Sequence, residues 1–458
     1  MKDNLKTLLE EPGCSHNRTK SDKDKLKKCS KPTPGAASGG CAFDGAQIVL
    51  LPIADAAHLI HSPINCSQSW DNRGTRSINK EPFYRYGFTT MLNETDIVFG
   101  SESKLLSAIK EIDNKYKPSA IFVYNTCVTA MIGENIEDVC KKASKTLKTP
   151  IIPVDAPGFI GSKNLGNKLA GDALFRYVIG TGEPDYTTKY DINIIGEYNI
   201  AGELWQVLPL FRELGIRVLS KITGDSSYRE LTYAHKAKAN VVICSKALVS
   251  LARRMHEKYG IPYFEGSFYG IRETSKTLRK FTEILGDKNL QLRTEELIKL
   301  KELETNNELS ILLPYLKDKK AFVYSGGVKS WSIVYQLEEL GVQAIGTSTR
   351  KSTENDIEKL REHFEGTQKI LMEKGSGKEI LDILDKEKAD FFLAGGRNLY
   401  TAVKGKYPYI DVNQERIQAY AGYKGMVNLA KRIIYTLYSP VFKTAKTDAP
   451  WDLPHKLK

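Results

Sequence analysis

Three cysteines stand where strands of an α/β protein would end, and thiolates are the ligands that soft metals and iron–sulfur clusters prefer. Cys41 follows the segment SGG, Cys66 lies in the loop HSPINCSQSWDNRG, and Cys127 closes the apolar run SAIFVYNTC. Short turns rich in glycine and backbone N–H groups could present these sulfurs to a cluster. The alternative is that each thiol is a small buried apolar group, as cysteines without a ligand commonly are.

A fourth cysteine, Cys244, ends the run ANVVIC directly before a predicted helix, SKALVSLARRMHEKYG. A sulfur near a helix N-terminus loses its proton more readily, which suits metal ligation, and a buried structural thiol is the alternative. The remaining cysteines, Cys14, Cys29 and Cys140, suit structural or incidental roles. Seven scattered cysteines without a CxxC pair argue against a disulfide framework and against the usual zinc sites, so a metal site would need distant segments.

Two glycine turns end apolar runs in the last third of the chain. FVYSGGVKSW contains Gly326 and Gly327 with Lys329 close behind, and FFLAGGRNLY contains Arg397 directly after its glycines. Neither turn matches a Walker loop or GxGxxG, so nucleotide binding is weakly indicated. Exposed amides beside a cation favour an anionic ligand, and tight turns with solvated cations are the alternative.

The elements that would position these residues alternate between short apolar runs and longer amphipathic stretches, which predicts doubly wound α/β domains. We expect three Rossmann-like domains with mostly parallel sheets, at residues 41–189, 190–315 and 316–458, after an extended basic arm at 1–40. Strands are predicted in these runs: AQIVLLPI, SAIFVYNTC, PIIPVDAP, DINIIGE, RVLSKITG, ANVVICSKA, KAFVYSGG, VQAIGTST, KILMEK and DFFLAGG. In such sheets ligands bind beyond the carboxyl ends of the strands.

Length and composition limit the classes of protein to which this chain can belong. The 458 residues suffice for about three domains, and 41% hydrophobic with 27% charged residues is typical of a globular protein. The net charge of +12 comes without arginine runs interleaved with aromatic residues, which argues against a nucleic-acid partner. No apolar stretch is long enough for a membrane helix, and the N-terminus lacks a secretory signal, so we expect a cytoplasmic protein.

Several long segments together resemble the cofactor-assembly scaffolds of the nitrogenase molybdenum–iron protein family. The likeness runs from about residue 31 to about residue 431, without gaps inside the motifs. The segments are SKPTPGAASGGCAFDGAQ, INCSQSWDNRGTRS, VYNTCVTAMIGEN, VDAPGFIGSKNLG, VVICSKALVSLARRMHEKYGIPYFEGSFYGI, YSGGVKSWS and DVNQERIQAYAGYKG.

The resemblance implies a heterotetramer of two such subunits with two homologous N subunits. Cys41, Cys66 and Cys127 match positions that hold a 4Fe-4S cluster at the subunit boundary, with the fourth thiolate from the partner. Cys244 matches the cysteine that ligates one end of an iron–sulfur–carbide precursor. In the family, a radical-SAM protein supplies this precursor. It acquires molybdenum and homocitrate with help from the ATP-hydrolysing iron protein.

Departures from the catalytic subunit favour a scaffold over an enzyme. Asn413 stands where the enzyme has a cofactor-binding histidine, and Asn167 replaces a second pocket histidine; an amide is a poor ligand compared with imidazole. A cluster held at one end only can be altered and released. Lys329 and Arg397 match cations near the cofactor and homocitrate. A catalytic α subunit of a nitrogenase-like reductase is the alternative, and a basic nucleotide-binding or nucleic-acid-binding α/β protein is a third hypothesis.

Overall fold

The computed structural model describes residues 40–67, 87–243, 245–349, 352–373, 375–413 and 417–447. The predicted basic arm therefore lies outside the described residues, apart from Gly40. The chain forms two compact units: the first takes the described residues up to Ile200, with Leu208–Gly266 and Glu283–Gly286, and the second takes the rest. No helix in the described ranges has the length and apolar character needed to cross a bilayer.

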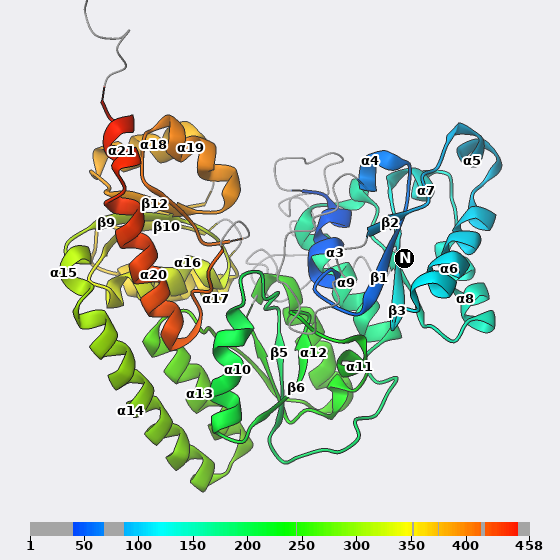
Figure 1. Ribbon diagram of the computed structural model, residues 1–458, viewed down its shortest axis with the longest axis horizontal. Helices are drawn as coiled ribbons and strands as arrows, with labels where there is room; N and C mark the ends of the chain where they lie inside the picture. Colours follow the sequence, from blue (N-terminus) through cyan, green and yellow to red (C-terminus); the bar gives the residue numbers. More distant parts are fainter. Residues whose placement is uncertain are drawn as a thin grey trace, which may run out of the picture. The chain divides into compact units, whose positions relative to one another are not determined.

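Three parallel sheets confirm the predicted α/β class (Figure 1). The first sheet has the order β2-β1-β3-β4 and the second β6-β5-β7-β8, both in the first unit; the third, β11-β10-β9-β12-β13, lies in the second unit. Every neighbouring pair of strands runs parallel. The predicted domain limits fall between the sheets and stay predictions.

The first sheet separates two layers of helices. Phe122 and Tyr124 of β3 pack with α3 and α9, whereas Ile121 and Val123, on the opposite face, pack with α6 and α8. The elements of this part are α3 (Ala42–Leu50), β1 (Ala56–His61), α4 (Ile64–Ser67), β2 (Gly87–Thr89), α5 (Glu94–Phe99), α6 (Glu102–Tyr116), β3 (Ala120–Asn125), α7 (Cys127–Met131), α8 (Ile136–Thr146), β4 (Ile151–Asp155), the 3₁₀ turn η3 (Gly158–Ile160) and α9 (Lys163–Tyr177).

One predicted strand is wrong: most of the run AQIVLLPI lies in helix α3. This helix is buried on nearly all sides between the sheet and α9, so its sequence is apolar all round and resembles a buried strand. The strand of this region is β1, AAHLIH, which follows a few residues later and is fully buried. Its two histidines concealed it from a search for apolar runs.

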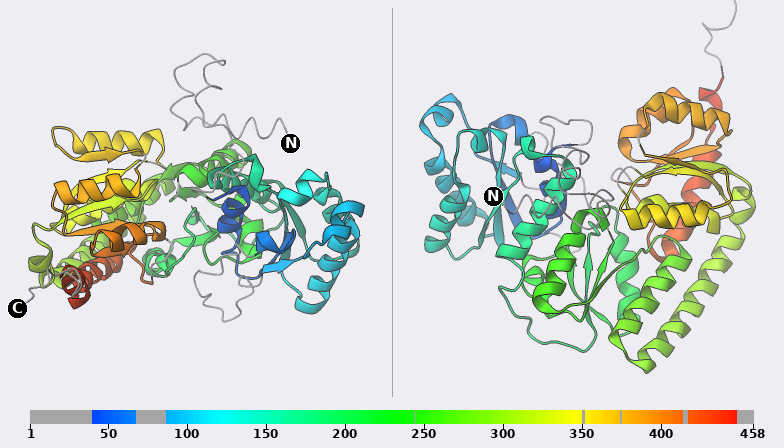
Figure 2. Two further views of the ribbon diagram at one scale, coloured as in Figure 1. Left: turned by 90° about the horizontal axis from the view of Figure 1, so that it is seen from above. Right: turned by 180° about the vertical axis from the view of Figure 1, so that it is seen from behind.

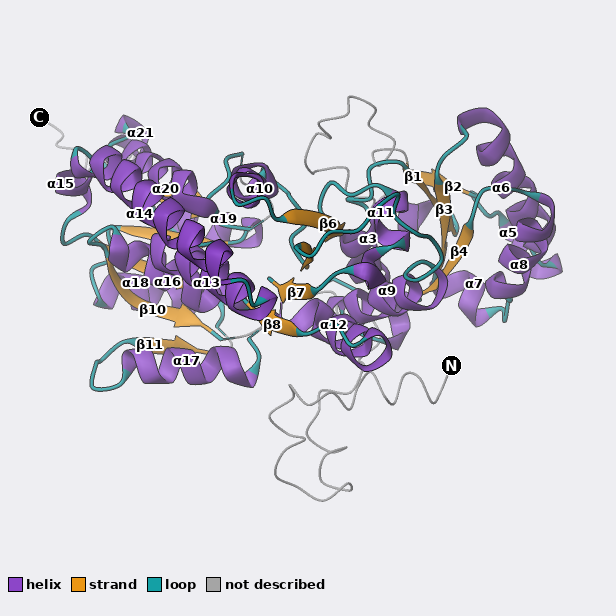
Figure 3. Ribbon diagram, turned by 90° about the horizontal axis from the view of Figure 1, so that it is seen from below, coloured by secondary structure: helices purple, strands orange, loops and turns teal. Residues whose placement is uncertain are grey.

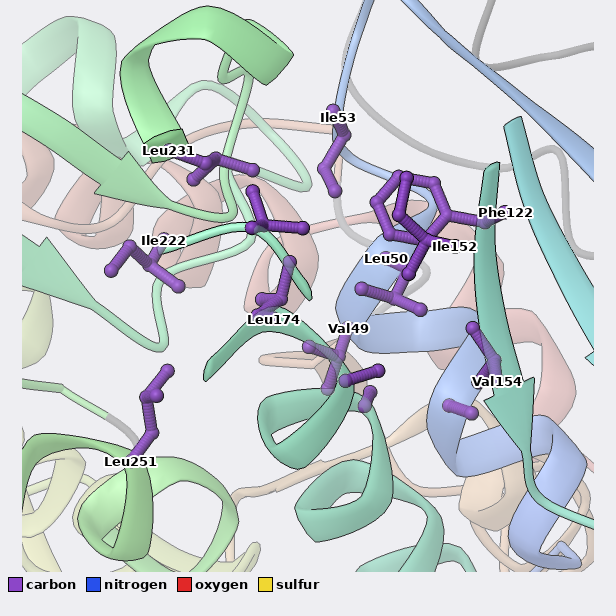
Figure 4. Packing of buried hydrophobic residues seen from close by; sticks show 14 of the residues in the cluster. Val49, Leu50, Ile53, Phe122, Ile152, Val154, Leu174, Ile222, Leu231 and Leu251 are labelled. Carbon is purple, nitrogen blue, oxygen red and sulfur yellow. The ribbon is translucent and has the colours of Figure 1, made fainter. Parts of the chain in front are cut away.

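The second sheet shares a core with the first. Ile222, Leu231 and Leu251 from the second sheet and its helices pack in the same cluster as Leu50 and Leu174 of α3 and α9 (Figure 4). Its elements are β5 (Asp191–Ile195), α10 (Glu203–Glu213), β6 (Arg217–Ile222), α11 (Tyr228–Thr232), η4 (Ala234–Lys236), β7 (Ala239–Val242), α12 (Ser245–Tyr259), β8 (Tyr263–Glu265) and α13 (Ile271–Leu285).

The third sheet is covered on one face by α18 and α19 and on the other by α16 (Figures 1 and 2), and β11 lies at one edge of this sheet (Figure 3). Stacked Phe322 and Phe392 form the centre of the α18 and α19 side. The elements are α14 (Lys288–Ser310), α15 (Leu313–Leu316), β9 (Lys320–Tyr324), α16 (Val328–Glu339), β10 (Gln343–Ser348), α17 (Glu354–Phe364), β11 (Ile370–Met372), α18 (Gly377–Lys386), β12 (Phe391–Ala394), η5 (Gly396–Asn398), α19 (Leu399–Lys404), β13 (Tyr409–Asp411), α20 (Gly422–Leu437) and α21 (Pro440–Ala445).

Candidate iron–sulfur cluster site

The topology places two of the predicted cysteines at a switch point of the first sheet. In the order β2-β1-β3-β4, the chain leaves neighbouring strands β1 and β3 in opposite directions, which opens a crevice at their carboxyl ends. Cys66 lies in α4, the short helix after β1, and Cys127 opens α7, the helix after β3. Both thiols therefore follow strands that hydrogen-bond to each other.

Cys41 reaches the same site from the start of α3, where it is the N-cap residue. Burial is the largest influence on this thiol and raises its pKa, whereas the nearby backbone N–H groups of Asp44 and Phe43 lower it. An isolated antiparallel bridge to Ser162 holds this segment. The expectation that Cys41 begins a strand is therefore wrong, because it caps a helix.

Gly158 shows that Cys41 and Cys127 converge. A Cβ at this glycine would lie 3.0 Å from the sulfur of Cys127 and 3.2 Å from the sulfur of Cys41. Both sulfurs thus face one backbone position, at the start of η3, where the absence of a side chain leaves room beside them. The third thiol, Cys66, packs against the same hydrophobic cluster as Cys41.

The protonation of these thiols reflects their crowding. Burial raises the pKa of Cys66 most, and the neighbouring Cys127 and Cys41 raise it further, because adjacent thiolates repel one another. The nearby side chain of Thr126, the N-cap residue of α7, lowers the pKa of Cys66. A positive group that displaces the protons would relieve this repulsion, which is what a cluster of iron ions supplies.

A buried histidine, His61, forms hydrogen bonds near the segments that carry Cys66 and Cys127. His61, the last residue of β1, contacts Glu134 Oε2 through Nε2 at 2.6 Å and Thr90 Oγ1 through Nδ1 at 3.0 Å. Its carbonyl accepts a hydrogen bond from the Thr126 hydroxyl at 2.8 Å. Burial is the largest influence on its pKa and lowers it, against the opposing charge of Glu134. His61 is a hydrogen-bonded structural residue, as the sequence indicated.

The donor set fits an iron–sulfur cluster better than a single ion. Among the described residues, no three His, Cys, Asp or Glu side chains are arranged to ligate one metal ion. A 4Fe-4S cluster requires one thiolate for each iron, so its ligands stand apart around a larger body. Three half-buried thiols, two backbone N–H donors and a side-chain-free space at Gly158 match that requirement.

The third sheet gathers other predicted residues at its own switch point, between β9 and β12. The side chain of Asn413, just after β13, lies against Gly395, whose Cβ would come within 2.7 Å of Asn413 Nδ2. Asn413 Oδ1 is also 3.4 Å from the hydroxyl of Ser325, at the end of β9. Lys329, in the first turn of α16, donates to the carbonyl of Val412 at 3.1 Å.

Four other predicted residues have different surroundings. Gly327 is the N-cap residue of α16 with φ of 64°, a conformation that glycine adopts easily, and Gly326 precedes it. Arg397 is exposed in η5. When the oxygen and nitrogen of the Asn167 amide are assigned from their hydrogen-bond partners, the nitrogen donates to the carbonyl of Gly45 at 2.7 Å. This hydrogen bond connects α9 to α3. Cys244 lies outside the described residues; in the sequence it comes between β7 and α12.

Comparison with a family model decides the classification. Residues 41–438 match the model described as nitrogenase component 1 type oxidoreductase. This match spans most of the chain. The chain belongs to the nitrogenase component 1 family.

Relatives within the nitrogenase component 1 family are similar over nearly the whole chain. The chain is 53% identical to a nitrogenase iron-molybdenum cofactor biosynthesis protein NifE of Nostoc sp., over 98% of this chain and 93% of that protein. It is 47% identical to NifE of Klebsiella pneumoniae, over 97% and 98% respectively. A solved structure of nitrogenase Cp1 at pH 6.5 superposes with a TM-score of 0.84 at 27% identity, covering 98% of this chain and all of that one.

Sequence reasoning missed several residues of the site in this nitrogenase component 1 protein. Gly158 lies in the motif VDAPGFIG, whose proline and glycine could have marked a close backbone approach. Asp44 and Thr126 are each within three residues of a cysteine, but their contacts depend on helix N-caps that the sequence reading did not assign. Glu134 carried no signal, because its partner His61 is distant in the chain.

Proposed function

We propose that this chain is a scaffold for biosynthesis of the nitrogenase iron-molybdenum cofactor. It would receive an iron–sulfur precursor as cargo, support insertion of molybdenum and homocitrate, and pass the product to the catalytic protein. The observation that carries the proposal is the convergence of Cys41 and Cys127, from distant segments, on Gly158, with Cys66 in the short helix that follows the neighbouring strand β1. The names of the relatives, cofactor biosynthesis proteins, support this role over that of a reductase.

Cys41, Cys66 and Cys127 would hold the resident 4Fe-4S cluster, termed here the boundary cluster, with a fourth thiolate from a homologous N subunit. When bound, the cluster would supply one-electron transfer. Exposed apolar side chains near the thiols support a partner surface: Ile64 is in the same short helix as Cys66, and Met131 is in the helix that Cys127 opens. Apolar side chains exposed in this way commonly mark protein–protein contacts.

Different residues would hold the cargo. Cys244 would ligate one end of the precursor, and Asn167 and Asn413, as amides, would leave the remaining surface without a strong ligand. Lys329 and Arg397 would offer positive charge to the anionic cargo and to homocitrate, a polycarboxylate. The glycine turn at Gly326 and Gly327 would add backbone N–H groups. Weak retention of the product follows from this donor set and suits a protein that must release it.

The proposed partners follow from this role. Two copies of the chain would assemble with two N subunits. The nitrogenase iron protein and a radical-SAM protein would bind this complex transiently. We propose no catalytic residue in this chain. Its own residues would bind and orient the cargo while the visiting proteins supply electrons and precursor.

Anaerobic co-purification with the partner subunit tests the function. We expect iron and acid-labile sulfide in the complex, with an electron paramagnetic resonance signal on reduction. Triple replacement of Cys41, Cys66 and Cys127 by alanine should remove the boundary cluster. A wild-type complex without iron or sulfide would refute the proposal, and acetylene reduction at the rate of an authentic nitrogenase would favour the reductase instead.

A further inference from the structure

Asp44 is a carboxylate at the candidate cluster site that the proposed function does not use. It lies in the first turn of α3, three residues after Cys41, and its backbone N–H is close enough to the thiol of Cys41 to lower its pKa. A Cβ on Gly40 would overlap Asp44 Oδ2, so the carboxylate is folded back over the residue that precedes Cys41. The charged group of Asp44 is therefore held at the cysteine end of the helix.

The position of Asp44 puts its charge beside the candidate cluster site. Its carboxylate lies against Gly40, the residue before Cys41, and the sulfurs of Cys41 and Cys127 face the same glycine, Gly158. Among the residues that the structure describes, no cation forms an ion pair with Asp44. The helix dipole favours a negatively charged side chain in the first turn of a helix.

We infer that Asp44 lowers the reduction potential of the boundary cluster. This inference rests on the proposed function, because it assumes that Cys41 and Cys66 hold the cluster. Reduction adds one electron and no proton to a site that is already negative, so a nearby fixed negative charge disfavours the reduced form. Net charge and hydrogen bonds to the sulfurs are known determinants of cluster potential.

The backbone and the side chain of Asp44 act in opposite directions. An N–H group close to the sulfur of Cys41 stabilises negative charge and raises the potential. Replacement of Asp44 by asparagine keeps this backbone donor and the size of the side chain and removes only the charge. The variant therefore isolates the electrostatic contribution of the carboxylate.

Anaerobic redox titration of the complex with its partner tests this inference, with the electron paramagnetic resonance signal of the reduced cluster as readout. Asp44→Asn should favour reduction by about tenfold, which is a shift of about 59 mV to more positive potential for a one-electron couple. Asp44→Glu keeps the charge, so the reduction potential of its cluster should be close to that of the wild type. The matched control is Glu111→Gln, which removes a carboxylate from an exposed position of α6, a helix without any of the cysteines.

The outcomes separate the two proposals. A wild-type complex with no iron would overturn the proposed function and this inference with it. A full iron content in Asp44→Asn with an unchanged potential, or a shift equal to that of Glu111→Gln, would overturn the inference alone. Loss of iron from Asp44→Asn would also overturn it, because Asp44 would then be needed to hold the cluster and not to set its potential.

Discussion

Gly166 of α9 packs directly against the backbone carbonyl of Ala42 in α3, so closely that a Cβ at position 166 would overlap the carbonyl oxygen. Gly45 makes the reciprocal contact with the carbonyl of Lys163. Because Ala42 follows Cys41, the two glycines set the position of this thiol through backbone contact alone. The packing of two helices thereby affects the geometry of the candidate cluster site.

Gly166→Ala should therefore separate the two helices and displace Cys41. A backbone oxygen cannot rotate away, so we expect a loss of about 1–3 kcal/mol in the free energy of unfolding, together with reduced iron content. Gly171→Ala in the same helix is the control, since its Cβ would meet mainly the flexible side chain of Leu248. Chemical denaturation and iron analysis measure both effects. Equal behaviour of the two variants would contradict the role of the Gly166 contact.

Gly158→Ala should remove the boundary cluster while leaving the fold intact. The new methyl group would stand 3.0 Å from the sulfur of Cys127 and 3.2 Å from that of Cys41, inside the space that a cluster needs. The chain without iron should keep its unfolding midpoint, because the neighbouring sulfurs can adjust slightly. Iron analysis of the complex measures the loss of the cluster, and thermal unfolding measures whether the fold is kept. A full complement of iron in this variant would show that the cluster does not approach Gly158.

Much of the fold was predictable because buried parallel strands are short, apolar and β-branched, as in β3, β5 and β9. Helix α3 was not predictable, because a helix buried on nearly all sides has the same apolar composition as a buried strand. The positions of Cys66 and Cys127 could be predicted because each follows a buried strand, whereas Cys41 caps a helix that the sequence did not predict. The contacts of Gly158, Asp44 and Glu134 could not, because each depends on residues that only the folded chain brings together.

Cys244→Ala should abolish retention of the precursor and leave the boundary cluster in place. The proposed cargo ligand and the three cluster cysteines follow strands of different sheets, so the two sites should be separable. Cys140→Ala is the control, because burial raises the pKa of this core thiol to about 12 and it has no proposed ligand. Iron content measured before and after loading with precursor reports the difference. Unchanged precursor iron in Cys244→Ala would show that another residue holds the cargo.

Stability should fall in acid partly because of His58 in β1. This side chain is fully buried, with Nδ1 at 2.9 Å from the Tyr124 hydroxyl, and burial lowers its pKa from 6.5 to about 3. The unfolded chain then binds a proton that the folded chain excludes, so stability is lost as the pH falls below about 6.5. The slope is about 1.4 kcal/mol per pH unit. Between pH 6 and pH 4, the free energy of unfolding measured by urea denaturation should fall less steeply with pH in His58→Gln than in the wild type. Equal slopes in the two proteins would show that this loss of stability does not come from His58.

Asn413→His should make the chain retain its cargo more strongly. The proposed scaffold releases its product because an amide at this position is a weak ligand, and imidazole would supply a second strong one. The side chain of Asn413 lies against Gly395, where the missing Cβ makes room for the amide. Transfer of the matured cofactor to the cofactor-free catalytic protein should slow, by about tenfold if the new bond contributes about 1.4 kcal/mol to retention. Asn413→Gln keeps an amide and should transfer at the wild-type rate. If both variants slow transfer equally, the effect comes from packing at Gly395 and not from ligation.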